Sequence, residues 1–291
     1  QQDVSKPAIA RSHRGSTQRA ALTNKKVMVM MNTSPQAVTP LTSPKALKRE
    51  IPLSPTLQQH IYSRRNAITQ ILNGTDDRLL VVLGPCSIHD PKSALEYASR
   101  LATIQNELSN ELLLVMRVYL EKPRTTIGWK GLINDPDINN TCDINRGYAI
   151  ARKLLLDISQ LGIAAGTEFL SLITPHYIAD LISWAAIGAR TVNSPLHREL
   201  ASGLEMPVGF KNDINGNVQT AIDALNTAQH AQQATSLSED GNAIITKTAG
   251  NPNGHIILRG GIKSPNYDEN TLGHSHHLLN TIQVPGNRIM I

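Results

Sequence analysis

The sequence predicts an α/β protein built as a (β/α)8 barrel, and three observations lead to this fold class. Segments with strand character alternate along the chain with segments of helix character, which is typical of repeated βα units. Aromatic residues make up only 3% of the 291 residues while hydrophobic residues reach 40%, so the core must be aliphatic, as in parallel strands covered by helices. No glycine-rich dinucleotide fingerprint follows the first predicted strand, which disfavours an open, doubly wound sheet.

Residues 1–39 are predicted to form a disordered basic leader. Its single acid, Asp3, lies among many lysines and arginines, and an organelle transit segment is the alternative interpretation. The longest apolar run in this leader, Val27 to Met31, is too short for a signal-peptide core or a membrane span. We therefore expect no association with a membrane.

The formal net charge of +5 comes largely from this leader, because the remainder of the chain is near neutral. A nucleic-acid-binding protein would need a basic face on its folded domain, with aromatic side chains for stacking, so we expect no nucleic-acid partner. The two cysteines, Cys86 and Cys142, do not make a disulfide framework. A cytoplasmic protein is expected.

Residues 40–76 are predicted to form an N-terminal arm and a helix, and residues 77–291 to form the barrel. Prolines among serines and threonines predict an extended conformation for residues 32–56, and apolar residues at helical spacing predict a helix that ends at Asn73-Gly74. Short apolar runs bounded by turn residues predict seven strands, at residues 79–83, 112–119, 163–169, 188–192, 206–211, 255–261 and 287–291. Helices are predicted between them, and residues 242–250 are predicted to lie outside the main sheet.

The most informative stretch covers residues 112–136, where an apolar run ends abruptly in charged residues. These are Arg117, Glu121, Lys122 and Arg124. The carboxyl ends of parallel strands are where ligands bind in α/β proteins. Four further predicted strands also end at or near a charged residue, and these residues are Glu168, Arg190, Lys211 and Arg259. A cluster of cations repels itself unless an anion occupies it, so the pattern predicts a binding site for phosphate or carboxylate groups.

Three features allow more than one interpretation. A single Arg or Lys at a strand end is usually a solvated cap or part of a salt bridge, and only the recurrence over several strands favours the anion site. Glu168 either balances an arginine or positions a catalytic water. Cys86 is either an inert buried thiol or, beside His89 in a strand-exit loop, a metal ligand. The histidines of the GHSHH run are predicted to lie on the surface rather than to bind metal, and these are His274, His276 and His277.

Several long motifs, in the right order, resemble the type I 3-deoxy-D-arabino-heptulosonate-7-phosphate (DAHP) synthases of bacteria and fungi. The resemblance covers residues from about 40 to 291 and is carried by LGPCSIHDP, VMRVYLEKPRTTIGWKGLINDP, SWAAIGART, HRELASGL, PVGFKN and HIILRGG. It implies a (β/α)8 barrel that condenses phosphoenolpyruvate (PEP) with erythrose 4-phosphate, releases phosphate, and opens the shikimate pathway of aromatic amino acid biosynthesis. A related sugar-acid phosphate synthase is disfavoured by the KPRT motif.

The resemblance also implies roles for individual residues. The PEP-binding residues it implies are Arg117, Lys122, Ala189, Arg190, Lys211 and Arg259. The residues facing erythrose 4-phosphate are Pro123, Arg124 and Thr125. Lys122 and Glu168 are expected to act in catalysis, and Cys86 to bind a divalent Mn, Fe, Co or Zn ion. In the family the N-terminal extension helps to form the oligomer and the site for a feedback aromatic amino acid, so a homo-oligomer with such an inhibitor is expected.

Departures from the family pattern limit these expectations. The sequence ends at Ile291, so we expect an incomplete barrel without strand eight, in which Cys86 is separated from metal ligands (a His, a Glu and an Asp) that lie beyond the chain end. The alternative function is therefore a catalytically inactive fragment or diverged paralogue that binds PEP-like anions or associates with a full-length synthase. The motifs ARTVNSP and GFKNDINGN also differ from the usual ones, and Asp213 beside Lys211 predicts weakened PEP binding.

Overall fold

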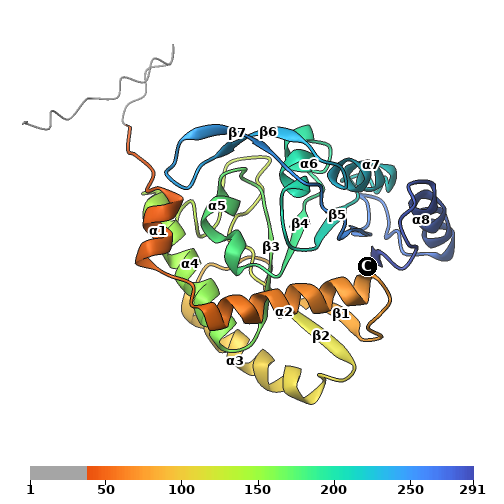
Figure 1. Ribbon diagram of the computed structural model, residues 1–291, viewed down its shortest axis with the longest axis horizontal. Coiled ribbons are helices and arrows are strands. Elements are labelled where there is room, and N and C mark those ends of the chain that lie inside the picture. The colour runs from red at the N-terminus through yellow and green to blue at the C-terminus, as the bar shows by residue number, and fades with distance from the viewer. Residues whose placement is uncertain (1–37) are drawn as a thin grey trace, which may run out of the picture. The chain divides into compact units, whose positions relative to one another are not determined.

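A computed structural model describes residues 38–291, and residues 1–37 of the predicted leader lie outside the described part. Within residues 41–291, seven strands form one parallel sheet in the order β1-β2-β3-β4-β5-β8-β9 (Figure 1). These strands are β1 (Leu79–Leu83), β2 (Leu112–Arg117), β3 (Ala164–Glu168), β4 (Trp184–Ile187), β5 (Val208–Lys211), β8 (Gly254–Ile257) and β9 (Ile289–Met290). Because all neighbouring pairs are parallel, the carboxyl ends of the strands lie along one edge of the sheet.

Helices alternate with these strands, as the predicted βα units require. They are α3 (Pro91–Glu107), α4 (Ile144–Gln160), α5 (Thr174–Ile178) with the 3-10 turn η1 (Ala179–Leu181), α6 (Pro195–Ser202), α7 (Gln219–Ala228) and α8 (Glu269–Thr281). A separate antiparallel hairpin, β6 (Gln233–Leu237) with β7 (Ala243–Lys247), lies outside the main sheet, as predicted. The fold class is confirmed. No helix in residues 38–291 combines the length and apolar character needed to cross a membrane.

The central strands β2 to β5 and β8 are buried on both faces, whereas the edge strands β1 and β9 are partly exposed, and the sheet curls around an interior. Along β2, Leu114 and Met116 join the large apolar cluster shared with the surrounding helices, whereas Leu113 and Val115 join a second cluster with residues of β4 and β8. In the sheet β5 separates β4 from β8, yet the indole Nε1 of Trp184 donates to the imidazole Nε2 of His255 at 3.2 Å. The contact passes over Gly209 of β5, where a Cβ would lie 2.8 Å from His255 Nε2, and it is favoured by the curvature of a barrel.

The inner cluster is completed by the long N-terminal helix α2 (Pro55–Leu72). Its residues Ile68 and Leu72 are buried against the strand interior. Ser54 caps this helix by accepting from the N–H of Leu57, and the helix ends beside Asn73-Gly74, as predicted.

Two predicted elements differ from the structure. The extended arm contains a helix, α1 (Pro44–Glu50), because Pro44 occupies the first helical position, where its missing N–H costs nothing, and the Ser43 hydroxyl accepts from the N–H of Ala46. The predicted strand at residues 188–192 was wrong. The strand is Trp184–Ile187, and the carbonyl of Gly188 instead accepts from the N–H groups of Thr191 and Val192 in a turn.

Candidate anion-binding site

Arg117, the last residue of β2, is held between an aromatic ring and a backbone carbonyl. Its guanidinium carbon lies 3.7 Å from the centroid of the Tyr119 ring, and its Nη2 donates to the carbonyl of Cys86 at 3.3 Å. Its buried Nε has no hydrogen-bond partner within residues 38–291. Gly84, with φ of 143°, lets the β1 exit loop approach Arg117, since a Cβ there would lie 3.1 Å from the Arg117 carbonyl oxygen. Arg117 is therefore oriented by the protein, yet keeps donor capacity for a ligand.

Lys122 joins the ends of β1 and β2. Its Nζ lies 3.5 Å from the Sγ of Cys86 and 3.2 Å from the Oγ of Ser87. Desolvation is the largest single influence on the Cys86 thiol and opposes its ionisation. The hydrogen bond and charge of Lys122, with smaller contributions from Arg117 and Ser87, together outweigh it and lower the pKa of Cys86. Cys86 is exposed rather than a buried thiol, and its role as a metal ligand stays a prediction.

Lys211 and Glu168, the last residues of β5 and β3, form an ion pair across the sheet. Their side chains are only 17% and 8% exposed, so the pair is shielded from water. The Lys211 ammonium also donates to the Tyr119 hydroxyl at 3.4 Å. A Cβ at Gly188 would lie 2.4 Å from Oε1 of Glu168, so a larger residue there would displace the carboxylate. In this state Glu168 does balance a cation, but that cation is a lysine rather than an arginine.

Arg259 is placed by two buried asparagines. Its backbone N–H donates at 2.9 Å to Oδ1 of Asn212, the residue after Lys211, and the same oxygen accepts from Nδ2 of Asn266 at 3.0 Å. Asn212 is completely buried and Asn266 nearly so. The Nδ2 of Asn212 donates to the carbonyls of Asp213 and Gly260. The polar atoms of Asn212 are thus saturated, and the ends of β5 and β8 are locked together.

The remaining predicted site residues lie on loops near this edge, and within residues 38–291 no hydrogen bond or ion pair joins their side chains to the cluster. Arg190 is exposed and Ala189 half-buried, in the loop after β4. Pro123, Arg124 and Thr125 belong to a loop closed by the Lys122 N–H, which donates to the carbonyl of Lys130 at 2.8 Å. Arg124 Nε donates to the carbonyl of Trp129 at 2.8 Å. Their ligand contacts stay predictions.

Residue-by-residue reasoning from the sequence missed three residues that organise this site, namely Tyr119, Asn212 and Asn266. Tyr119 lies two residues after Arg117, where the sequence predicts the end of a buried strand. The two asparagines gave little signal, because their partner is recognisable only when β5 and β8 pair. Glu121 is one of the charges that end the predicted strand, but its sequence context predicts no role for it. The structure buries its carboxylate, which accepts from the N–H groups of Leu170 and Ser171. Burial, with a smaller contribution from the nearby Glu168 charge, raises the pKa of Glu121.

Of the metal ligands expected for the family, residues 38–291 contain only Cys86. No group of three or more His, Cys, Asp or Glu side chains suited to a metal ion occurs in residues 38–291, so the donors of this region do not make a metal site by themselves. His274, His276 and His277 lie on α8 and are exposed, as predicted, and they contribute to no such group in residues 38–291.

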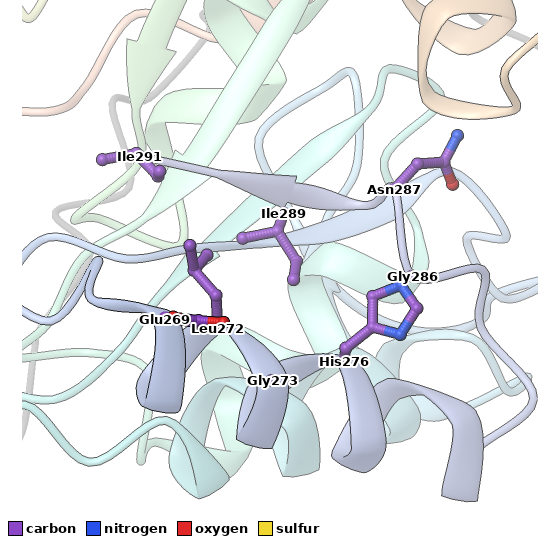
Figure 2. A pocket seen from close by; sticks show the side chains of 8 residues that line it. All are labelled: Glu269, Leu272, Gly273, His276, Gly286, Asn287, Ile289 and Ile291. Carbon is purple, nitrogen blue, oxygen red and sulfur yellow. The ribbon is translucent and has the colours of Figure 1, made fainter.

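Two surface cavities lie away from these cations. One, of about 610 Å³, lies between α8 and β9, where Leu272 and His276 of the helix face Ile289 of the strand (Figure 2). The other, of about 650 Å³, is lined by the start of α3, residues 132–138 and α4. Neither is lined by a residue of the cation cluster, so the chemistry is located by the charged side chains rather than by cavity volume.

The structure is a barrel that gathers cations and a carboxylate at the carboxyl ends of its strands. This arrangement is typical of enzymes that bind anionic substrates at that edge. The chain matches the model of the DAHP synthetase I family over residues 50–291, and it belongs to this family. It is 53% identical over 251 residues to the Phe-sensitive phospho-2-dehydro-3-deoxyheptonate aldolase of Escherichia coli strain K12, covering 86% of this chain and 71% of that protein. It is 50% identical over 245 residues to the Trp-sensitive enzyme of Enterobacter agglomerans, covering 84% and 70%.

A solved structure gives the same result. The phospho-2-dehydro-3-deoxyheptonate aldolase of Francisella tularensis SCHU S4 superposes with a TM-score of 0.85 at 46% sequence identity, covering 86% of this chain and 74% of that one. The expected family is therefore confirmed.

Proposed function

We propose that this protein condenses phosphoenolpyruvate with erythrose 4-phosphate to give DAHP and phosphate, the first step of the shikimate pathway. The observation that carries this proposal is the continuous set of contacts that joins the ends of β2, β3 and β5 through Arg117, Tyr119, Lys211 and Glu168. Lys122 continues the set to the β1 exit loop. Family membership supplies the identity of the anions.

The residue types suit this substrate. PEP carries a phosphate and a carboxylate close together, and a second phosphate must approach with the aldehyde, so cations are needed to offset the repulsion. We assign Arg117, Lys122 and Lys211, with Arg190, Arg259 and the backbone of Ala189, to the groups of PEP. The guanidinium fork of arginine binds two oxygens at once, which suits phosphate and carboxylate.

The second substrate is assigned to the loop that Lys122 begins. Pro123, Arg124 and Thr125 face erythrose 4-phosphate in this proposal. Arg124 uses its Nε on the Trp129 carbonyl, which leaves the two terminal nitrogens of its guanidinium for a phosphate. An exposed loop closed at its base by the Lys122 N–H suits a substrate that arrives after PEP.

Lys122 and Glu168 are the proposed catalytic residues. The Lys122 ammonium is placed to donate a proton to the alkoxide that develops when carbon 3 of PEP attacks the aldehyde. Glu168 handles the proton of the water that adds to carbon 2, and its pairing with Lys211 orients its carboxylate. The family is metal-dependent in general, and we assign Cys86 as a ligand of a divalent Mn, Fe, Co or Zn ion. Residues 38–291 do not complete that metal site.

The regulation and assembly of this protein are proposed by analogy with its relatives. Those relatives are described as Phe-sensitive and Trp-sensitive, so we propose feedback inhibition by an aromatic amino acid. We also propose a homo-oligomer in the cytoplasm.

A second function is favoured by one observation, the incomplete set of metal donors in residues 38–291. The protein would then bind PEP-like anions without turnover, or associate with a complete synthase. Its anion-binding residues are the same, so the two functions differ in turnover and not in PEP affinity.

The test measures PEP binding by calorimetry and DAHP formation from both substrates with added Mn²⁺. Binding with turnover supports the synthase, binding without turnover supports the second function, and absence of both contradicts the anion site. Lys122→Met should abolish turnover. The matched control is Lys153→Met, which removes an exposed lysine of α4 that pairs with Asp157, and it should leave both measurements unchanged.

A further inference from the structure

Tyr119 contacts cations from two strands that are not neighbours in the sheet. Arg117 of β2 stacks on its ring at 3.7 Å, while the ammonium of Lys211 on β5 lies 5.1 Å from the ring centroid and 3.4 Å from the hydroxyl oxygen. Strands β3 and β4 separate β2 from β5 in the sheet. Tyr119 itself is only 5% exposed. A nearly buried ring therefore spans the two sides of the cation cluster.

The contacts of Tyr119 counteract the mutual repulsion of the cations in this site. Several cations are gathered where an anion is expected, and without the anion they repel one another. Glu168 neutralises Lys211, whereas Arg117 has no carboxylate partner within residues 38–291. The face of an aromatic ring carries partial negative charge and attracts a guanidinium stacked on it, most strongly where water is excluded. The ring of Tyr119 thus offsets the positive charge of Arg117, as the carboxylate of Glu168 offsets that of Lys211.

A buried tyrosine that only fills the core has different contacts. Tyr177 is an example, because its ring stacks on Tyr148 at 4.2 Å and its hydroxyl donates to the backbone carbonyl of Thr42 at 2.6 Å. It contacts no residue of the cation cluster. Burial is the main cause that raises the pKa of Tyr119, so its hydroxyl stays neutral and accepts from the Lys211 ammonium.

We propose that Tyr119 is a positioning residue whose ring fixes Arg117 and whose hydroxyl fixes Lys211, so that both cations are correctly spaced for PEP before it binds. The proposal rests on the proposed function for the identity of the ligand. The two parts of the side chain have separable effects. The ring governs most of the affinity through Arg117, whereas the hydroxyl, with one hydrogen bond of 3.4 Å to Lys211, has a small effect on affinity and acts mainly on turnover through the Lys211–Glu168 pair. Preorganised cations bind more tightly because less order must be created on binding.

Two variants separate these effects. Tyr119→Phe keeps the ring and removes the hydroxyl, so we expect PEP affinity to stay within about threefold while kcat falls about tenfold. Tyr119→Leu removes the ring, so we expect PEP affinity to fall at least about tenfold as well. The control is Tyr177→Phe, which loses one hydrogen bond at similar burial and should change thermal stability but not PEP affinity. Equal PEP affinity in the Leu variant and the wild type would overturn the proposal.

A second measurement does not depend on PEP. Brief treatment with acetic anhydride, followed by mass spectrometry, reports how readily each lysine amine reacts. Lys211 should react at least about threefold faster in both Tyr119 variants than in the wild type, with exposed Lys153 as the internal reference. Unchanged Lys211 reactivity in both variants would overturn the positioning role, even in a protein that binds PEP. A wild type that fails to bind PEP would instead contradict the proposed function, while the reactivity of Lys211 would still decide the role of Tyr119.

Discussion

The arginines of the helical layer and the arginines at the carboxyl ends of the strands use the same side chain in opposite ways. Arg152 on α4 is 1% exposed, forms a two-pronged pair with Asp180, and donates to the backbone carbonyls of Ile51 and Tyr177. Arg65 on α2 is similarly engaged with two carbonyls and a carboxylate. Arg117 has one hydrogen bond and one ring contact. The number of committed donors therefore separates arginines that hold the fold from Arg117, which keeps donors for the proposed ligand.

This difference has an energetic reason. A buried guanidinium has lost its hydration and must recover it from protein acceptors, as Arg152 does. The guanidinium of Arg117 has no such set of acceptors, but the residue is only half-buried, so water or an anion can reach part of it at the edge of the sheet. Variants of the two kinds should consequently change different quantities: stability in the first, and affinity in the second.

The largest effect is expected for Arg152→Met, which keeps the volume and removes the donors. Asp180 and two carbonyls lose their partner, and breaking a buried pair in this way costs about 3 kcal/mol of unfolding free energy. Urea unfolding measures the change. The matched control is Arg146→Met on the same helix, because the pair of Arg146 with Asp137 is exposed, and its midpoint should not move. If Arg152→Met and Arg146→Met changed the unfolding free energy equally, the distinction drawn between the arginines would not hold.

Arg117→Met should show the opposite behaviour. Its unfolding free energy should change little, whereas the dissociation constant for PEP should rise on the order of a hundredfold, since a charge-assisted contact is lost in a partly shielded site. The dissociation constant of Arg117→Lys should lie between those of the wild type and Arg117→Met, because an ammonium restores the charge but not the guanidinium fork. Calorimetry with PEP measures these dissociation constants. A variant that lost stability and kept its affinity would place Arg117 with the structural arginines.

How far the sequence predicts this molecule depends on whether the signal is local. Arg117, Lys211 and Glu168 could be predicted because each one ends an apolar strand, and parallel strands bring their ends together. Helix α1 was missed because Pro44 looks like a breaker when the capping bond of Ser43 is unknown. The contacts of Tyr119 depend on how strands far apart in the chain come together, which no local pattern reports.

The histidine in the sheet interior extends the comparison to a group that needs its neutral form. His255 accepts from Trp184, and burial, with a smaller contribution from Arg288, lowers its pKa from the ordinary 6.5 to about 3. The unfolded chain takes up a proton below about pH 6.5 and the folded protein does not. Stability is therefore full above that pH and falls as the pH drops toward 3, by about 1.4 kcal/mol per pH unit.

The variant His255→Gln should remove this dependence, because an amide oxygen still accepts from Trp184 but does not titrate in this range. The slope of unfolding free energy against pH, measured in urea, should become shallower than in the wild type. His276→Gln on the exposed face of α8 is the control and should keep the wild-type slope. Equal slopes in all three proteins would show that acid sensitivity arises elsewhere.

The smallest effect concerns Asp213, whose charge lies two residues from Lys211 and is predicted to weaken PEP binding. Its Oδ1 accepts from the N–H groups of Asn215 and Asn217 at 2.9 Å, so the carboxylate also shapes its loop. Asp213→Asn keeps an acceptor at that position and removes only the charge, whereas Asp213→Gly removes both. We expect the Asn variant to bind PEP about twofold more tightly at low salt, with the gain disappearing as salt screens the partly exposed charge. Calorimetry at two ionic strengths tests this, and equal affinity for PEP with and without either substitution would remove Asp213 from the account of the site. A gain in the Gly variant alone would assign the effect to the loop rather than to its charge.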